Sequence, residues 1–207
     1  MSLALAKGKG VELRRRRQTF FATSTGSYVS TTSSQIRIEI NLDKEVLDFD
    51  TGYLMFDMIL TKNGGTTDTI AGLPWSASSW IKDLRVYDRA GREIGEQIRQ
   101  YNGMARKHYE LLGNEGCNSA GNYMDILEGA VGISASGTGA SASTTSVEFA
   151  HKFLSHIFDI KSYFPAHLMG GLIIEIDMED QANVGLMNGT TDDVTSYTIS
   201  NVRYVCD

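Results

Sequence analysis

The stretch QIRIEINL, residues 35–42, decides the fold class. Ile36, Ile38, Ile40 and Leu42 alternate with polar residues, and this period of two is typical of a strand that buries one face. A helix would instead place apolar residues three and four positions apart. The segment therefore predicts a half-buried β-strand.

The same alternation recurs along the rest of the chain. DRAG at 88–91 predicts a tight turn between two of the strands, and a break in the pattern between Ile199 and Val202 predicts a β-bulge. Met104–Leu112 is the one segment with a helical pattern, and Gly113 follows it as a helix-ending residue. Strands are expected at 35–42, 53–61, 79–88, 92–98, 146–153, 171–179, 182–187 and 197–205.

Eight strands without helical crossovers argue against a parallel sheet and favour an antiparallel sandwich or barrel. A jelly roll has that number of strands. We therefore predict an all-β protein, a single eight-stranded antiparallel jelly roll (β-sandwich) with one short helix. Residues 35–207 would form this domain. The uncharged, low-complexity run at 129–146 is expected to be a surface loop.

Residues 1–34 differ in charge from everything that follows. They hold six basic residues against Glu12, a net charge of 6 − 1 = +5, whereas the remainder holds 13 basic and 24 acidic residues, a net charge of −11. No periodic apolar pattern is present, and seventeen uncharged residues follow Arg17. We predict a flexible basic arm on an acidic body.

The arm is the candidate binding site. Arginine donates two hydrogen bonds to one phosphate group, and a basic tether binds polyanions without reading their sequence. A targeting signal for nuclear import is the alternative for such a run. The candidate nucleic-acid-binding residues are Lys7, Lys9, Arg14, Arg15, Arg16 and Arg17. Phe20 and Phe21 would stack on bases or, as we favour, anchor the arm on a neighbouring surface.

Motifs for catalysis, cofactors and metals are absent. The chain has neither a G-x-S-x-G nucleophile motif nor a phosphate-binding glycine loop, and its four histidines have no zinc-like spacing. The carboxylates of 43–50 and 177–180 would bind calcium between subunits or, as we favour, form a solvated acidic edge. Cys117 and Cys206 are interpreted as free thiols. We predict no enzyme, no cofactor and no metal site.

Two segments carry a resemblance to a known family. The first contains Leu47, Asp48, Tyr53 and Leu54, and the second contains Phe164, Pro165, Leu168, Leu172, Ile174 and Glu175. They resemble segments of jelly-roll capsid proteins of icosahedral viruses, most closely the adenovirus-like lineage that includes virophages, in which the first segment opens the roll. Major capsid proteins of the lineage usually carry two rolls in one chain, whereas this chain has room for one. A shell subunit or a pentamer at the vertices is therefore implied.

The resemblance implies a viral structural protein that assembles with copies of itself, as pentamers or a closed shell, and with other capsid proteins. The arm would face the interior and bind genome phosphates. The protein would be part of the virion, assembled in the cytoplasm or nucleus of the host, without a membrane span. The alternative is a vertex, spike or lectin-like module that binds a receptor or carbohydrate. Its binding surface would use loops 62–79 and 113–146 with Trp75, Trp80 and Tyr123, although Trp80 is expected in the core.

Overall fold

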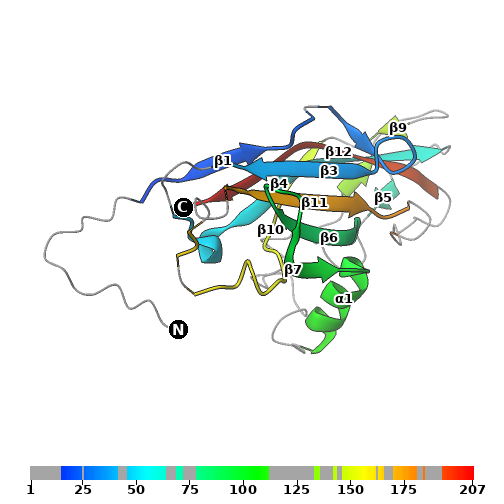
Figure 1. Cartoon of the computed structure of the whole chain (residues 1–207). Coiled ribbons are helices and arrows are strands. Elements are labelled where there is room, and N and C mark those ends of the chain that lie inside the picture. Colours follow the sequence, from blue (N-terminus) through cyan, green and yellow to red (C-terminus); the bar gives the residue numbers. More distant parts are fainter. Residues whose placement is uncertain are drawn as a thin grey trace, which may run out of the picture.

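Two antiparallel sheets pack face to face in the computed structural model, with the α-helix α1 (Tyr101–Leu111) at one side (Figure 1). The structure describes residues 15–24, 26–41, 46–63, 69–71, 78–111, 133–135, 142–143, 146–161, 163–165, 170–180, 184 and 193–207.

The first sheet has the order β1 (Gln18–Phe21), β12 (Asp193–Cys206), β4 (Tyr53–Asn63) and β10 (Val147–His151). Two short strands extend it, because β2 (Tyr28–Val29) pairs with β12 and β9 (Ala142–Ser143) pairs with β4. The second sheet has the order β3 (Gln35–Ile40), β11 (Leu172–Met178), β6 (Ile81–Asp88) and β7 (Glu93–Ile98). A separate pair consists of β5 (Thr69–Ala71) and β8 (Ile133–Ala135).

The path of the chain through these sheets is that of a jelly roll. Among the described residues, eight strands have four or more residues: β1, β3, β4, β6, β7, β10, β11 and β12. Numbered one to eight along the chain, they lie in the order 1-8-3-6 in the first sheet and 2-7-4-5 in the second. Among these eight strands, only β6 and β7 are successive strands of one sheet, and each of the other connections crosses between the sheets. The predicted eight-stranded sandwich is confirmed.

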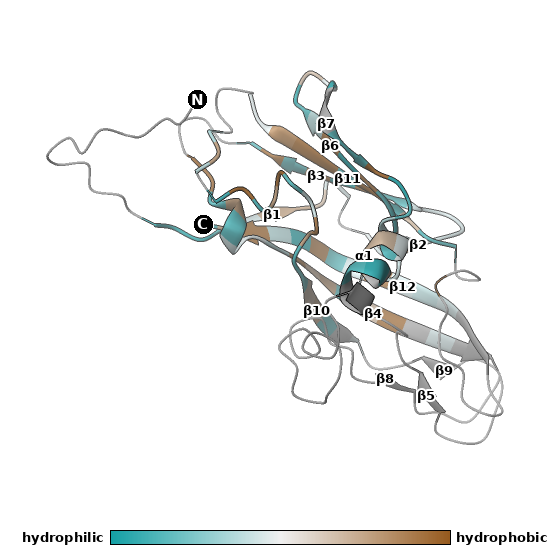
Figure 2. Ribbon diagram, turned by 90° about the horizontal axis from the view of Figure 1, so that it is seen from below, coloured by the Kyte–Doolittle hydropathy of each residue, from teal (hydrophilic) through white to brown (hydrophobic). Residues whose placement is uncertain are grey.

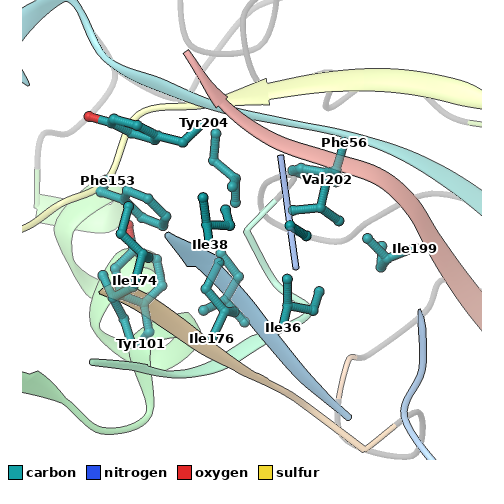
Figure 3. Packing of buried hydrophobic residues seen from close by; sticks show 14 of the residues in the cluster. Ile36, Ile38, Phe56, Tyr101, Phe153, Ile174, Ile176, Ile199, Val202 and Tyr204 are labelled. Carbon is teal, nitrogen blue, oxygen red and sulfur yellow. The ribbon is translucent and has the colours of Figure 1, made fainter. Parts of the chain in front are cut away.

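The core lies between the two sheets and consists of the alternating apolar residues. Ile36, Ile38 and Ile40 of β3 are fully buried, whereas Gln35 and Arg37 are exposed, as the period of two requires. Figure 3 shows Ile36 and Ile38 of β3 and Ile174 of β11 facing residues of β4 and β12. Figure 2 shows the same pattern as hydrophobic colour along the middle strands and hydrophilic colour at their ends and in α1.

An irregularity in β12 was visible in the sequence and is confirmed. The pairing of β12 with β4 shifts between Ser200 and Arg203, and Asn201 adopts a positive φ of 52°. Asparagine tolerates this conformation better than most residues. Its side-chain amide donates a hydrogen bond to Asp57 on β4, which holds the bulge against the sheet.

Two expectations for the middle of the chain need correction. The helix α1 (Tyr101–Leu111) begins three residues before the predicted start, because the fully buried Tyr101 anchors its first turn in the core. The run 129–146 was expected to be a loop, but β8 and β9 lie within it and pair with β5 and β4. The predicted strand 182–187 lies outside the described residues except for Val184, which is in a turn.

The extent of the arm also needs correction, because the first strand of the roll lies within residues 1–34. β1 pairs with β12, and beyond it the chain crosses to the second sheet. At this crossing the Ala22 N–H donates to Val202 and the Thr23 N–H donates to Arg37 of β3. Residues 18–21 and 28–29 therefore belong to the first sheet and do not form a loose tether.

Candidate nucleic-acid interface at the base of the arm

The base of the arm lies beside the carboxyl-terminal end of the chain. Gln18 opens β1 and pairs with Cys206, so Arg17 lies beside Asp207, past the end of β12. Figure 1 shows that β1 begins next to the carboxyl terminus. Arg15, Arg16 and Arg17 are exposed there.

Arg15 and Arg17 contact acidic residues of the body. The Arg17 Nε atom lies 3.3 Å from Asp207 Oδ1, and Arg17 Nη2 donates to the Thr51 carbonyl at 3.4 Å. The Arg15 Nη2 atom lies 3.7 Å from Asp48 Oδ2. Arg16 belongs to neither of these ion pairs.

The carboxylates that receive the arm are held by backbone contacts at the end of the sandwich. The Asp48 N–H donates to the Asp207 carbonyl at 2.8 Å, and the Asp207 N–H donates to Thr51 Oγ1 at 3.1 Å. Thr51 Oγ1 in turn donates to the Asp48 carbonyl at 2.8 Å. The short helix η1 (Phe49–Thr51) and the carboxyl terminus are thereby tied together. Asp48 and Asp207 lie far apart in the sequence, so their proximity could not be read from it.

A second charged group lies on the same helical turn. Asp50 Oδ1 is 2.8 Å from Lys152 Nζ and 2.9 Å from Lys161 Nζ. Hydrogen bonds from Lys152 and Lys161 lower the pKa of Asp50 to about 2. Asp50 was expected to belong to a solvated acidic edge, and it does remain partly exposed. Its charge, however, is compensated by the two lysines.

The remaining acidic candidates are also matched by polar partners. Asp177 accepts from Arg85 at 2.5 Å, and Glu179 accepts from the Asn102 side chain at 3.1 Å. Within the described residues, no group of three or more His, Cys, Asp or Glu side chains is placed to hold a metal ion. Asp43 and Glu45 lie outside those residues.

His151 and His156 contact groups of the fold itself. His151 is fully buried, and its Nε2 atom lies 2.7 Å from Tyr101 Oη, which also accepts from the Leu154 N–H at 2.8 Å. His156 is exposed, and its Nδ1 atom lies 3.3 Å from Glu96. Glu96 also accepts from the backbone N–H groups of His156 and Ile157, so it fixes the turn after β10.

The aromatic candidates differ in how far they are buried. Trp80 is fully buried, as expected for a core residue, whereas Trp75 and Tyr123 lie outside the described residues. Phe20 packs against the core next to Tyr204, its partner on β12. Phe21 points to the opposite face and is 64% exposed. Of this pair, only Phe21 is open to a neighbouring surface or a base.

Three of the six predicted phosphate ligands, Lys7, Lys9 and Arg14, lie outside the described residues. The structure brings the other three together at the end of the sandwich. Cys206 is a free, buried thiol, and burial raises its pKa to about 12. None of the helices in the described part is long and apolar enough to cross a bilayer.

The fold therefore defines the chain as a single jelly roll whose first strand is preceded by a basic segment. No family model matches the sequence, and no curated protein matches it. Among solved structures, a chain from the quasi-atomic model of the PBCV-1 virus capsid is similar, with a TM-score of 0.43 and 13% sequence identity. The similarity covers 96% of this chain and 45% of that chain, so this protein spans less than half the length of its structural neighbour.

Proposed function

We propose that this protein is a structural capsid subunit that assembles with copies of itself into an icosahedral shell. The arm would face the interior and bind genome phosphates. Two observations support a capsid role: the jelly-roll order of the strands and the resemblance of the segments around Leu47 and Phe164. These two segments meet in the structure, because the N–H of each residue donates to the carbonyl of the other, at 2.9 Å and 2.7 Å.

The proposal depends most on the basic arm. The fold alone does not distinguish a capsid subunit, because jelly rolls also serve as lectin and cupin domains. Residues 1–34 have a net charge of +5 and the remainder has −11. A polyanion is therefore attracted to one end of the molecule and repelled by the rest. Because Gln18 pairs with Cys206, the described arginines Arg15, Arg16 and Arg17 lie at one end of the sandwich. A receptor-binding module does not require such a separation of positive and negative charge.

In this role the body supplies contacts to other copies, as pentamers or as a closed shell, and to other capsid proteins. The protein is then a component of the virion, assembled in the cytoplasm or nucleus of the host cell. It performs no chemical reaction. The alternative, a vertex, spike or lectin-like module, would rely on loops 62–79 and 113–146. One of its three aromatic candidates, Trp80, is enclosed in the core and cannot contact a ligand.

Size-exclusion chromatography with light scattering tests the assembly. We expect particles of megadalton mass that form at low salt or with nucleic acid and appear as closed shells in electron micrographs. A monomer or small oligomer that ignores nucleic acid at every salt concentration would instead favour the receptor-binding alternative.

Two variants test the arm. One lacks residues 1–17, and the other keeps the length but carries glutamine at Lys7, Lys9 and Arg14–Arg17. Both should lose copurifying nucleic acid, seen as a fall in the ratio of absorbance at 260 to 280 nm, and both should remain folded by circular dichroism. If the glutamine variant retains nucleic acid, the charge of the arm is not what binds it.

A further inference from the structure

The arginines at the base of the arm differ in what they face. Side chains alternate between opposite sides of an extended chain, so Arg15 and Arg17 share a side that Arg16 does not. Arg15 pairs with Asp48, and Arg17 pairs with Asp207 and the Thr51 carbonyl. Arg16 is exposed and belongs to neither pair.

The pairing of β1 with β12 explains the contact of Arg17. Gln18 faces Cys206 in the antiparallel register, so the next pair along the two strands is Arg17 with Asp207. Opposite charges at directly facing positions stabilise an antiparallel pair. The ion pair between Arg17 and Asp207 therefore continues the ladder by one step beyond its last backbone pair.

We propose that the arginine run is divided by function, an inference that rests on the proposed binding of genome phosphates. Arg15 and Arg17 are positioning residues that hold the base of the arm against the body and keep β1 in register. Arg16 binds phosphate, together with Lys7, Lys9 and Arg14.

Electrostatics supports this division. A phosphate that approaches Arg17 comes close to Asp207, and one that approaches Arg15 comes close to Asp48, so repulsion by the carboxylate offsets the attraction. Both carboxylates are kept in place by the backbone contacts of Asp48 and Asp207 with each other and with Thr51. Arg16 has neither carboxylate as an ion-pair partner. With Arg15 and Arg17 paired to carboxylates, four of the six basic residues of the arm are left to bind nucleic acid. The net charge available for binding then falls from 6 − 1 = +5 to 4 − 1 = +3.

The first test compares Arg16→Gln with Arg17→Gln in the full chain. The two variants remove the same charge from adjacent positions. Binding to a mixed-sequence DNA duplex is measured from 50 to 300 mM salt, below the protein concentration at which particles form. Each phosphate contact contributes about 0.9 to the slope of log K against log salt. We expect Arg16→Gln to lower the slope by about 0.9 and to weaken binding about eightfold at 0.1 M salt. Arg17→Gln should change affinity by less than about twofold.

The second test measures how firmly the end of β12 is held. Cys206 is buried and pairs with Gln18, so a thiol reagent reaches it only when this part of the sheet opens. In a Cys117→Ser background it is the sole thiol. Arg17→Gln should speed the labelling of Cys206 about two- to fivefold, the effect of losing an exposed ion pair. Arg16→Gln should leave the rate unchanged, and so should added DNA, because Arg17 stays with Asp207.

The outcomes separate this inference from the proposed function. Equal losses of slope in the two variants, or faster labelling when DNA is added, would overturn the division of the arginines while leaving phosphate binding intact. If the slope is unchanged in both variants and also in the variant with all six basic residues replaced, the proposed binding of nucleic acid itself is overturned.

Discussion

Replacement of Gly52 by alanine should destabilise the protein through a steric clash with a buried ring. Gly52 follows η1 with φ −81° and ψ 141°, a conformation that alanine adopts freely. A Cβ atom there would lie 1.9 Å from Tyr204 Oη and 2.6 Å from Tyr204 Cζ. Tyr204 has little room to move, because the rings of Phe158 and Phe153 lie with centroids 5.5 Å and 6.1 Å from its own.

The cost follows from that confinement. Extra atoms in a well-packed core cost about 1–3 kcal/mol, and two contacts below 3.0 Å place Gly52→Ala in the upper half of this range. For a chain of this size, about 2–3 kcal/mol lowers the melting temperature by about 4–12 °C. Differential scanning calorimetry measures the shift. Gly103→Ala is the matched control, because its Cβ would meet nothing within 4 Å and alanine should stabilise the helix by about 0.5–1 kcal/mol.

A double-mutant cycle identifies the clashing group. The Tyr204 hydroxyl is buried and finds no hydrogen-bond partner among the described residues, so Tyr204→Phe alone should change stability by less than about 1 kcal/mol. In the Gly52→Ala background, Tyr204→Phe removes the 1.9 Å contact and should restore about 1 kcal/mol of the lost free energy of unfolding. If Gly52→Ala melts within 1 °C of the unmodified protein, or shows no coupling to Tyr204→Phe, the reasoning about this contact is refuted.

Two further predictions concern polar groups. Tyr101→Phe removes the hydroxyl that contacts His151 Nε2 and accepts from the Leu154 N–H. The free energy of unfolding, measured in urea, should fall by about 2–4 kcal/mol. An unchanged urea midpoint would contradict the role of this hydroxyl. The folded-state pKa of Asp50, about 2, is below its ordinary value of 3.8, so its stabilising contribution is present above pH 4 and is lost as the pH falls to 2. Asp50→Asn should therefore be less stable than the unmodified protein near pH 6 by no more than about 1 kcal/mol, since the pair is exposed, and the difference should vanish near pH 2. A difference that persists at pH 2 would mean that the carboxylate charge is not its source.

The positions of most strands could be predicted from the sequence, because burial follows local alternation. Ile36, Ile38 and Ile40 indicate which face of β3 enters the core without any knowledge of its partners. The β6–β7 hairpin, the bulge near Asn201 and the burial of Trp80 follow from equally local signals.

Partners that lie far apart in the chain were decided only by the tertiary structure. β1 is a strand because β12 provides hydrogen bonds along its edge and Phe20 reaches the core, while its uncharged Thr- and Ser-rich surroundings resemble a linker. The contact of Arg17 with Asp207 likewise exists because the first and last strands of the roll are neighbours. Composition alone indicates that the amino-terminal segment is basic. Which of its arginines face carboxylates and which face solvent depends on how the strands pair, and local sequence carries no information about that pairing.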